Sequence, residues 1–224
     1  MSSSTGSLFE RLKADCNSEW TLYTEHEFVR QMGSGTLPQS AFREYLVQDY
    51  LFLIQFARAY ALSVYKSRSL SEMRQGLEGL KAILEVEMGL HIRICERWGI
   101  SPNELEASPE ASETVAYTRF VLDAGNAGDI LDLYVALAPC MIGYGEIGRN
   151  LKGETATIRD NPYAEWIEEY ASEQYQKISN STKDYIDQLG SELSSEARYP
   201  HLKKLFSTAT RLEAAFWQMG LNKR

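Results

Sequence analysis

Apolar residues recur every three or four positions along almost the whole chain, and this spacing constrains the fold more than any other feature. The first such stretch places apolar side chains at Leu8, Phe9, Leu12, Cys16, Trp20 and Tyr23. This spacing puts apolar side chains on one face of an α-helix. The sequence shows no alternating strand pattern of useful length and no internal repeat. The chain is therefore predicted to be an all-α, single-domain helical bundle.

Turn and capping residues divide the pattern into segments. Ser69 or Ser71 is expected to cap one helix, which Gly99 ends, and Pro38 suits the first position of another. An irregularity is expected at Tyr199-Pro200. The predicted helices cover about residues 8–32, 39–65, 69–98, 114–124, 129–153, from 162 through at least 178, and 195–221.

Length and charge narrow the class of protein. The 224 residues fit one domain, 1–224, with residues 1–6 expected to be flexible. The net charge of -8 argues against a nucleic-acid surface, which needs a basic face. No uncharged apolar run approaches the roughly 20 residues of a membrane span, so no membrane partner is expected.

The start of the chain and its cysteines indicate a compartment. The charged residues that follow Ser7 are unlike a signal peptide. Cys16, Cys95 and Cys140 lack paired spacing, so we expect reduced thiols in the cytoplasm and no cysteine-based zinc site.

Cys140 is the first candidate for chemistry. It lies in an apolar, glycine-containing run, four residues before Tyr144, so a helix places both side chains on one face. A thiol that faces a cleft is a nucleophile candidate, whereas one in a packed core is a small apolar side chain. No histidine lies in a recognisable triad motif, so a papain-like hydrolase is disfavoured.

Asp49 interrupts a stretch that is apolar on nearly every side. Burial of a carboxylate is costly unless it is paired or hydrogen-bonded. One interpretation is a buried ion pair with Arg58 or Arg43. The other is a carboxylate that recognises an amino group or a protonated ring nitrogen, with Phe52 and Phe56 stacking on the ring.

Glu213 is surrounded by small and aromatic residues, with Phe216 and Trp217 three and four positions later. It is either an exposed helix residue or an acid in an apolar pocket that gives and takes a proton.

Two apparent motifs carry less weight. Gly143, Gly145 and Gly148 match G-x-G-x-x-G, but no strand precedes them, so close helix packing is the favoured interpretation. Glu87 and His91 share a helix face and are interpreted as a structural hydrogen-bonded pair, with a metal site as the lesser alternative. The paired Glu-x-x-His motif of di-metal bundles is absent.

Together these segments resemble the TenA family, the thiaminase II proteins of the haem-oxygenase-like fold. The resemblance covers nearly the whole chain. It rests on residues 42–50 (FREYLVQDY), 137–140 (LAPC), 144–146 (YGE), Glu213 and 216–217 (FW).

The resemblance implies a role for each candidate residue. Cys140 matches the nucleophile that adds to a carbon of an aminopyrimidine ring, and Glu213 matches the acid that manages the ring-nitrogen proton. Asp49 matches the carboxylate that holds the amino edge. The substrate-binding residues implied in addition are Tyr144, Tyr170, Tyr117 and Phe52. Phe52 stands where some members have a tyrosine.

The implied activity is hydrolysis of 4-amino-5-aminomethyl-2-methylpyrimidine to the hydroxymethyl compound in thiamin salvage, with thiamin cleavage as a related reaction. No metal or organic cofactor is expected, and a homotetramer is implied. One alternative is a non-catalytic pyrimidine-binding or regulatory protein. Another is an oxidative relative that uses haem, dioxygen or a di-metal centre.

Overall fold

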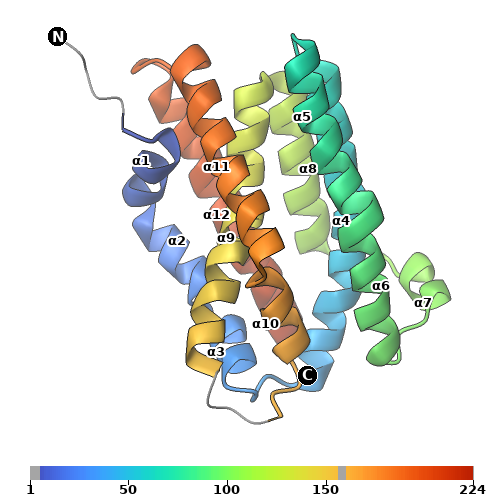
Figure 1. Ribbon diagram of the computed structural model, residues 1–224. Coiled ribbons are helices and arrows are strands. Elements are labelled where there is room, and N and C mark those ends of the chain that lie inside the picture. The colour runs from blue at the N-terminus through green and yellow to red at the C-terminus, as the bar shows by residue number, and fades with distance from the viewer. Residues whose placement is uncertain (1–5, 156–159, 224) are drawn as a thin grey trace. The chain divides into compact units, whose positions relative to one another are not determined.

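The computed structural model describes residues 6–155 and 160–223, and every regular element in these ranges is a helix (Figure 1). The all-α prediction is thus confirmed. Of the N-terminal segment expected to be flexible, residues 1–5 lie outside the described residues. The elements are α1 (Leu8–Asp15), α2 (Asn17–Thr24), α3 (Glu27–Gly33), α4 (Gln39–Lys66), α5 (Leu70–Lys81), the π-helix η1 (Ala82–Glu87), α6 (Met88–Arg97), α7 (Pro102–Ala107), α8 (Ser112–Ala127), α9 (Ile130–Thr155), α10 (Ala164–Tyr170), α11 (Glu173–Leu193) and α12 (Tyr199–Asn222).

The first predicted helix, over residues 8–32, is in fact three short helices. The chain leaves helical geometry at Cys16, where φ is -118° and ψ is 28°. The chain leaves helical geometry again at His26. The ring of His26 accepts a hydrogen bond from the Phe28 amide, and α3 begins there. A histidine cap gives no standard sequence signal, because the usual capping residues are Ser, Thr, Asp and Asn.

The segment predicted as one helix over 69–98 is helical throughout but changes type in the middle. Ser69 accepts a hydrogen bond from the Glu72 amide at 3.2 Å, so it is the N-cap. Gly99 has φ +70°, and the Ile100 amide bonds the Cys95 carbonyl, which is the Schellman arrangement that favours glycine. Between these ends, η1 contains a wider turn than an α-helix.

The sixth predicted helix is also divided. α10 ends at Tyr170, and the Ser172 hydroxyl accepts a hydrogen bond from the Tyr175 amide to begin α11. The short helix α7 and the extension of α8 to Ala127 were not predicted.

The chain forms two compact units. One contains Met1–Leu37 and Tyr134–Trp217, and the other contains Pro38–Leu133 and Gln218–Arg224. We call them the cysteine unit and the aspartate unit after Cys140 and Asp49. The single domain expected from the length stays a prediction.

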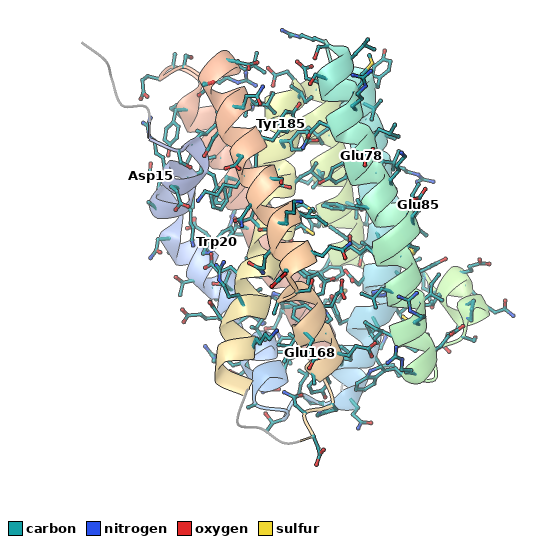
Figure 2. All side chains as sticks on the ribbon, in the orientation of Figure 1. Asp15, Trp20, Glu78, Glu85, Glu168 and Tyr185 are labelled. Carbon is teal, nitrogen blue, oxygen red and sulfur yellow. The ribbon has the colours of Figure 1, made fainter. Side chains whose placement is uncertain are left out.

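α4 is the central helix of the aspartate unit and contacts α5, η1, α6, α7 and α8, several of which run alongside it in Figure 1. Its inward residues include Phe42, Tyr45 and Leu46, each almost fully buried. Glu78 and Glu85 project from α5 and η1 and are exposed (Figure 2). α4 therefore provides the surface on which the rest of this unit packs.

Aromatic side chains dominate the core of the cysteine unit. Trp20, labelled in Figure 2, stacks on Phe206 with ring centroids 5.6 Å apart. Phe9 meets both rings edge-on, at 5.8 and 5.9 Å. Such pairs stabilise a core by ~1 kcal/mol each beyond their buried area.

Three glycines of α9 allow neighbouring segments to approach closely. A Cβ on Gly143 would lie 2.6 Å from the Tyr23 phenolic oxygen. A Cβ on Gly148 would lie 2.6 Å from the Tyr170 carbonyl carbon, and one on Gly145 would lie 3.1 Å from the Ser179 hydroxyl. The interpretation of this glycine run as helix packing is confirmed.

α9 is the one helix of the described chain that is long and apolar enough to cross a membrane. Its span, Ile130–Gly153, has mean hydropathy 1.4, and 94% of the apolar window is buried inside the protein. Asp132 and Glu146 lie within this span, so the expectation that no uncharged apolar run approaches the length of a membrane span holds. The burial shows that α9 is a core helix, since a helix apolar on all sides must be covered.

We expect Gly143→Ala to lower the free energy of unfolding by about 1–3 kcal/mol, because the new methyl group must displace the buried Tyr23 ring. Gly153→Ala is the matched control in the same helix, since nothing lies within 4 Å of its Cβ position. It should stabilise by up to about 1 kcal/mol. Urea unfolding of both variants measures the difference, and equal stability would contradict the packing role of Gly143.

Candidate functional site

Asp49 is a buried carboxyl with two neighbours. It lies on α4 with 3% of its surface exposed. The Tyr45 hydroxyl, one turn earlier, donates to Oδ2 at 3.1 Å. His91 of α6 places Nδ1 3.4 Å from the same oxygen. The expectation that Asp49 is buried is thus confirmed.

The predicted arginine partners of Asp49 were wrong. Arg43 donates to the Trp98 carbonyl and to Glu104 at 2.9 Å. Arg58 donates to Gln55 at 2.8 Å. Both guanidinium groups are long enough to reach partners at the helix surface, where a charge keeps its hydration. Asp49 points instead towards α6.

His91 is the residue that the sequence analysis misassigned. Within the described chain, both of its contacts go to α4: Nδ1 to Asp49, and Nε2 to the Leu46 carbonyl at 2.7 Å. It was expected to pair with Glu87 on its own helix. The π-turn of η1 directly precedes α6 and changes the angular position of everything after it, which an α-helical spacing rule cannot foresee.

Burial acts on the two side chains in opposite directions. It raises the pKa of Asp49 to about 7, an effect that the Tyr45 hydrogen bond partly offsets. It lowers the pKa of His91 to about 4, partly offset by the bond to Leu46. Between about pH 4 and pH 7 the pair therefore holds one proton, on Asp49, and is neutral.

The pH dependence of stability tests this pair. A raised carboxyl pKa makes the contribution of Asp49 fall as the pH rises from about 4 to 7, whereas the lowered pKa makes that of His91 fall as the pH drops from about 6.5 to 4. The two slopes cancel in the wild type. Asp49→Asn should therefore lose stability towards low pH and His91→Leu towards high pH, each by up to about 1.4 kcal/mol per pH unit.

Urea unfolding at several pH values between about 4.5 and 6.5 measures these slopes. Wild-type slopes in both variants would show that neither side chain has the protonation described above.

Aromatic side chains that follow Asp49 on α4 contact one another and α8. Phe52, three residues after Asp49, lies 5.1 Å from Tyr117 of α8 and 5.2 Å from Phe56, between ring centroids. Phe52 and Tyr117 are both almost fully buried. The structure thus brings together two of the residues proposed to bind a ring, on either side of the α4–α8 contact.

Cys140 lies on α9 in the cysteine unit, 9% exposed, directly after Pro139. Proline has no amide hydrogen, so the helix lacks one backbone hydrogen bond immediately before the thiol. The Tyr23 hydroxyl donates to the Pro139 carbonyl at 3.2 Å. Tyr23 thereby links α2 to the turn that carries Cys140.

Tyr144, one turn after Cys140, forms a four-ring group with three neighbouring aromatic side chains. Its centroid lies 5.0 Å from Tyr170, 5.3 Å from Trp217 and 5.7 Å from Trp166. Trp166 and Tyr170 are 4.4 Å apart on α10. The structure therefore brings the predicted residues Tyr144 and Tyr170 together, and adds two tryptophans that the sequence analysis did not assign to the site.

Glu213 is buried, with 1% of its surface exposed, so its interpretation as an exposed helix residue is wrong. It lies on α12 one turn before Trp217, which belongs to the four-ring group. Spacing by four places both side chains on the same face of the helix. The burial of Glu213 agrees with the other interpretation, in which this residue is a buried acid.

The candidate residues fall into two sets. Cys140, Tyr144, Tyr170 and Glu213 belong to the cysteine unit, and Asp49, Phe52 and Tyr117 to the aspartate unit. Among the residues described, no group of three or more His, Cys, Asp or Glu side chains is placed to hold a metal ion.

Comparisons with known proteins identify the family of the chain. The model of the TENA/THI-4/PQQC family matches residues 14–223. An aminopyrimidine aminohydrolase from Halalkalibacterium halodurans is 39% identical over 205 residues, covering 92% of this chain and 91% of that protein.

Solved structures show the same fold. A TenA family transcription regulator from Silicibacter sp. TM1040 superposes with a TM-score of 0.91 at 46% identity, covering 99% of both chains. A domain of unknown function with a heme oxygenase-like fold from Shewanella denitrificans has a TM-score of 0.75 at 12% identity, covering 96% of this chain and 92% of its own. The fold is therefore haem-oxygenase-like, and the chain belongs to the TENA/THI-4/PQQC family, as the resemblance to TenA proteins indicated.

Proposed function

We propose that the protein is an aminopyrimidine aminohydrolase of thiamin salvage. It converts 4-amino-5-aminomethyl-2-methylpyrimidine to the hydroxymethyl compound, and it cleaves thiamin in a related reaction. The observation that carries the proposal is the buried Asp49 carboxyl on the helix that also presents Phe52 to Tyr117. The similarity to the Halalkalibacterium aminohydrolase supports it.

The binding chemistry follows from the shape of an aminopyrimidine, which has apolar faces and a polar edge. Aromatic rings suit the faces, and a buried carboxyl suits the amino group on the edge. In the proposal, Asp49 receives that group, and Phe52, Tyr117, Tyr144 and Tyr170 bind the ring. Phe52 provides a ring face without the hydroxyl that some relatives have there.

The reaction is assigned to two buried side chains of the cysteine unit. The Cys140 thiolate adds to a ring carbon while Glu213 protonates the ring nitrogen, so that negative charge does not accumulate on the ring. The C–N bond to the leaving amine then breaks. Water takes the place of the amine, Glu213 recovers its proton, and the Cys140–carbon bond breaks to release the hydroxymethyl product.

Cys140→Ala should lower product formation at least about a thousandfold, because the covalent step needs the thiolate. Cys16→Ala is the matched control, since Cys16 is also a buried thiol of the same unit, 3.9 Å from the Lys203 carbonyl. Liquid chromatography of reactions with the aminomethyl pyrimidine and with thiamin measures the product. Equal turnover by wild type and Cys140→Ala would remove Cys140 from the mechanism.

Glu213→Gln should lower kcat about a hundredfold or more and weaken the pH dependence of kcat, because the amide cannot exchange a proton with the ring nitrogen. Glu168→Gln provides the control, since Glu168 projects from α10 and is exposed (Figure 2). A Glu213→Gln enzyme with a wild-type pH profile would assign the proton transfer to another group.

A regulatory role is the second candidate, because the similar Silicibacter protein is described as a transcription regulator. The net charge of -8 disfavours direct DNA contact. A protein that binds a pyrimidine without converting it would fit this role. The chromatography described above distinguishes such a protein from the proposed enzyme, because only the enzyme forms product. The homotetramer, the cytoplasmic location and the independence of cofactors stay predictions.

A further inference from the structure

His91 has no role in the proposed reaction. It is nevertheless buried, with 6% of its surface exposed, and it contacts the Asp49 carboxyl that is proposed to hold the substrate. The following inference rests on that proposed binding role of Asp49. Three contacts define the arrangement: Tyr45 hydroxyl to Asp49 Oδ2, His91 Nδ1 to the same oxygen, and His91 Nε2 to the Leu46 carbonyl.

The Leu46 carbonyl determines the tautomer of His91. A carbonyl oxygen only accepts hydrogen bonds, so Nε2, at 2.7 Å from it, must carry a hydrogen. Nδ1 then either has a lone pair directed at Asp49 or belongs to an imidazolium. A lone pair facing an ionised carboxylate would be repulsive, so the 3.4 Å contact favours a state in which the pair holds one proton, on Asp49 or on His91.

This shared proton keeps the pair neutral in both of its forms. With the proton on Oδ2 the pair is a carboxylic acid and an imidazole, and with the proton on Nδ1 it is a carboxylate and an imidazolium. Neither form places a net charge in the interior, which would be costly. The neighbouring titratable groups are the Tyr45 phenol on α4 and the Cys95 thiol on α6, whose pKa burial raises to about 12.

The contacts also leave one carboxyl oxygen for a ligand. Within residues 6–155 and 160–223, both contacts of the Asp49 carboxyl involve Oδ2 and none involves Oδ1. An amino N–H that donates to Oδ1 stabilises the carboxylate over the acid, because a hydrogen bond to the charged form favours that form.

We propose that Asp49 and His91 share one proton, and that binding of an aminopyrimidine at Oδ1 moves this proton from Asp49 Oδ2 to His91 Nδ1. The O–H bond breaks and an N–H bond forms, so the carboxyl becomes an anion and the imidazole a cation, with no proton exchanged with solvent. His91 is thus a positioning residue. It allows a buried acid to become a hydrogen-bond acceptor at the moment of binding.

The direct test is the ¹⁵N spectrum of the histidine rings in the full-length protein. His26→Asn and His201→Asn variants identify the other two histidines by the loss of their signals. The probe is 4-amino-2,5-dimethylpyrimidine, which has the amino edge but no leaving group. Without it, at pH 6, Nε2 should be protonated and Nδ1 bare; at saturation, Nδ1 should also become protonated.

A bare Nε2 in the unliganded protein would overturn the shared proton, and an unchanged Nδ1 at saturation would overturn its transfer. A wild type that does not bind the probe would overturn the proposed recognition of aminopyrimidines, and the transfer with it. The unliganded spectrum decides the tautomer of His91, on which the shared proton depends, independently of that result.

Calorimetric binding of the same probe separates positioning from a structural role. At pH 6, His91→Gln should bind about ten- to a hundredfold more weakly than wild type, because Asp49 must release its proton to solvent. The deficit should shrink by up to about tenfold per pH unit as the pH rises towards 7, where solvent removes the proton without His91.

His201→Gln, at an exposed position, is the matched control and should bind like wild type. His91→Asn provides a second variant in which the imidazole is also absent, and it should show the same pH-dependent deficit. A deficit independent of pH in both variants would indicate a purely structural effect and overturn the proposal.

Discussion

The close approach of neighbouring segments to α9 is the constraint on which the cysteine unit depends. At Gly143 and Gly148 the space of a Cβ is occupied by Tyr23 and by the Tyr170 backbone. The same contacts determine the surroundings of the thiol, because Tyr23 also bonds the Pro139 carbonyl next to Cys140. Packing and the proposed chemistry therefore depend on the same glycines, and a methyl group at either position would disturb both.

In the aspartate unit, the buried pair of Asp49 and His91 constrains how α4 and α6 pack. A lone carboxyl at the position of Asp49 would be costly in an apolar helix surface, and a lone imidazole at His91 equally so. Side by side, they share a proton and remain neutral. This explains how α4 tolerates an acid among phenylalanines without an arginine partner.

The secondary structure was largely predictable because burial imposes a period on apolar side chains. The prediction over 39–65 nearly coincides with α4, and Ser69 and Gly99 end their segment as expected. The errors have local causes: a histidine cap at His26, a serine cap at Ser172, and the π-turn η1. The histidine cap and the π-turn leave no standard signal in one sequence, whereas Ser172 is a usual capping residue and marks the start of α11 in the sequence as well.

The sequence by itself determined the all-α class, the burial of Asp49 and the identity of the candidate thiol and acids, because each depends on residue type and spacing along one helix. Only the tertiary structure decided that Glu213 is buried, that Tyr144 and Tyr170 meet, and that Asp49 contacts His91 rather than Arg43 or Arg58. These facts depend on which helices pack together and at what rotation. The wider turn of η1 precedes His91, and spacing along one helix does not specify how such a turn rotates α6 towards α4.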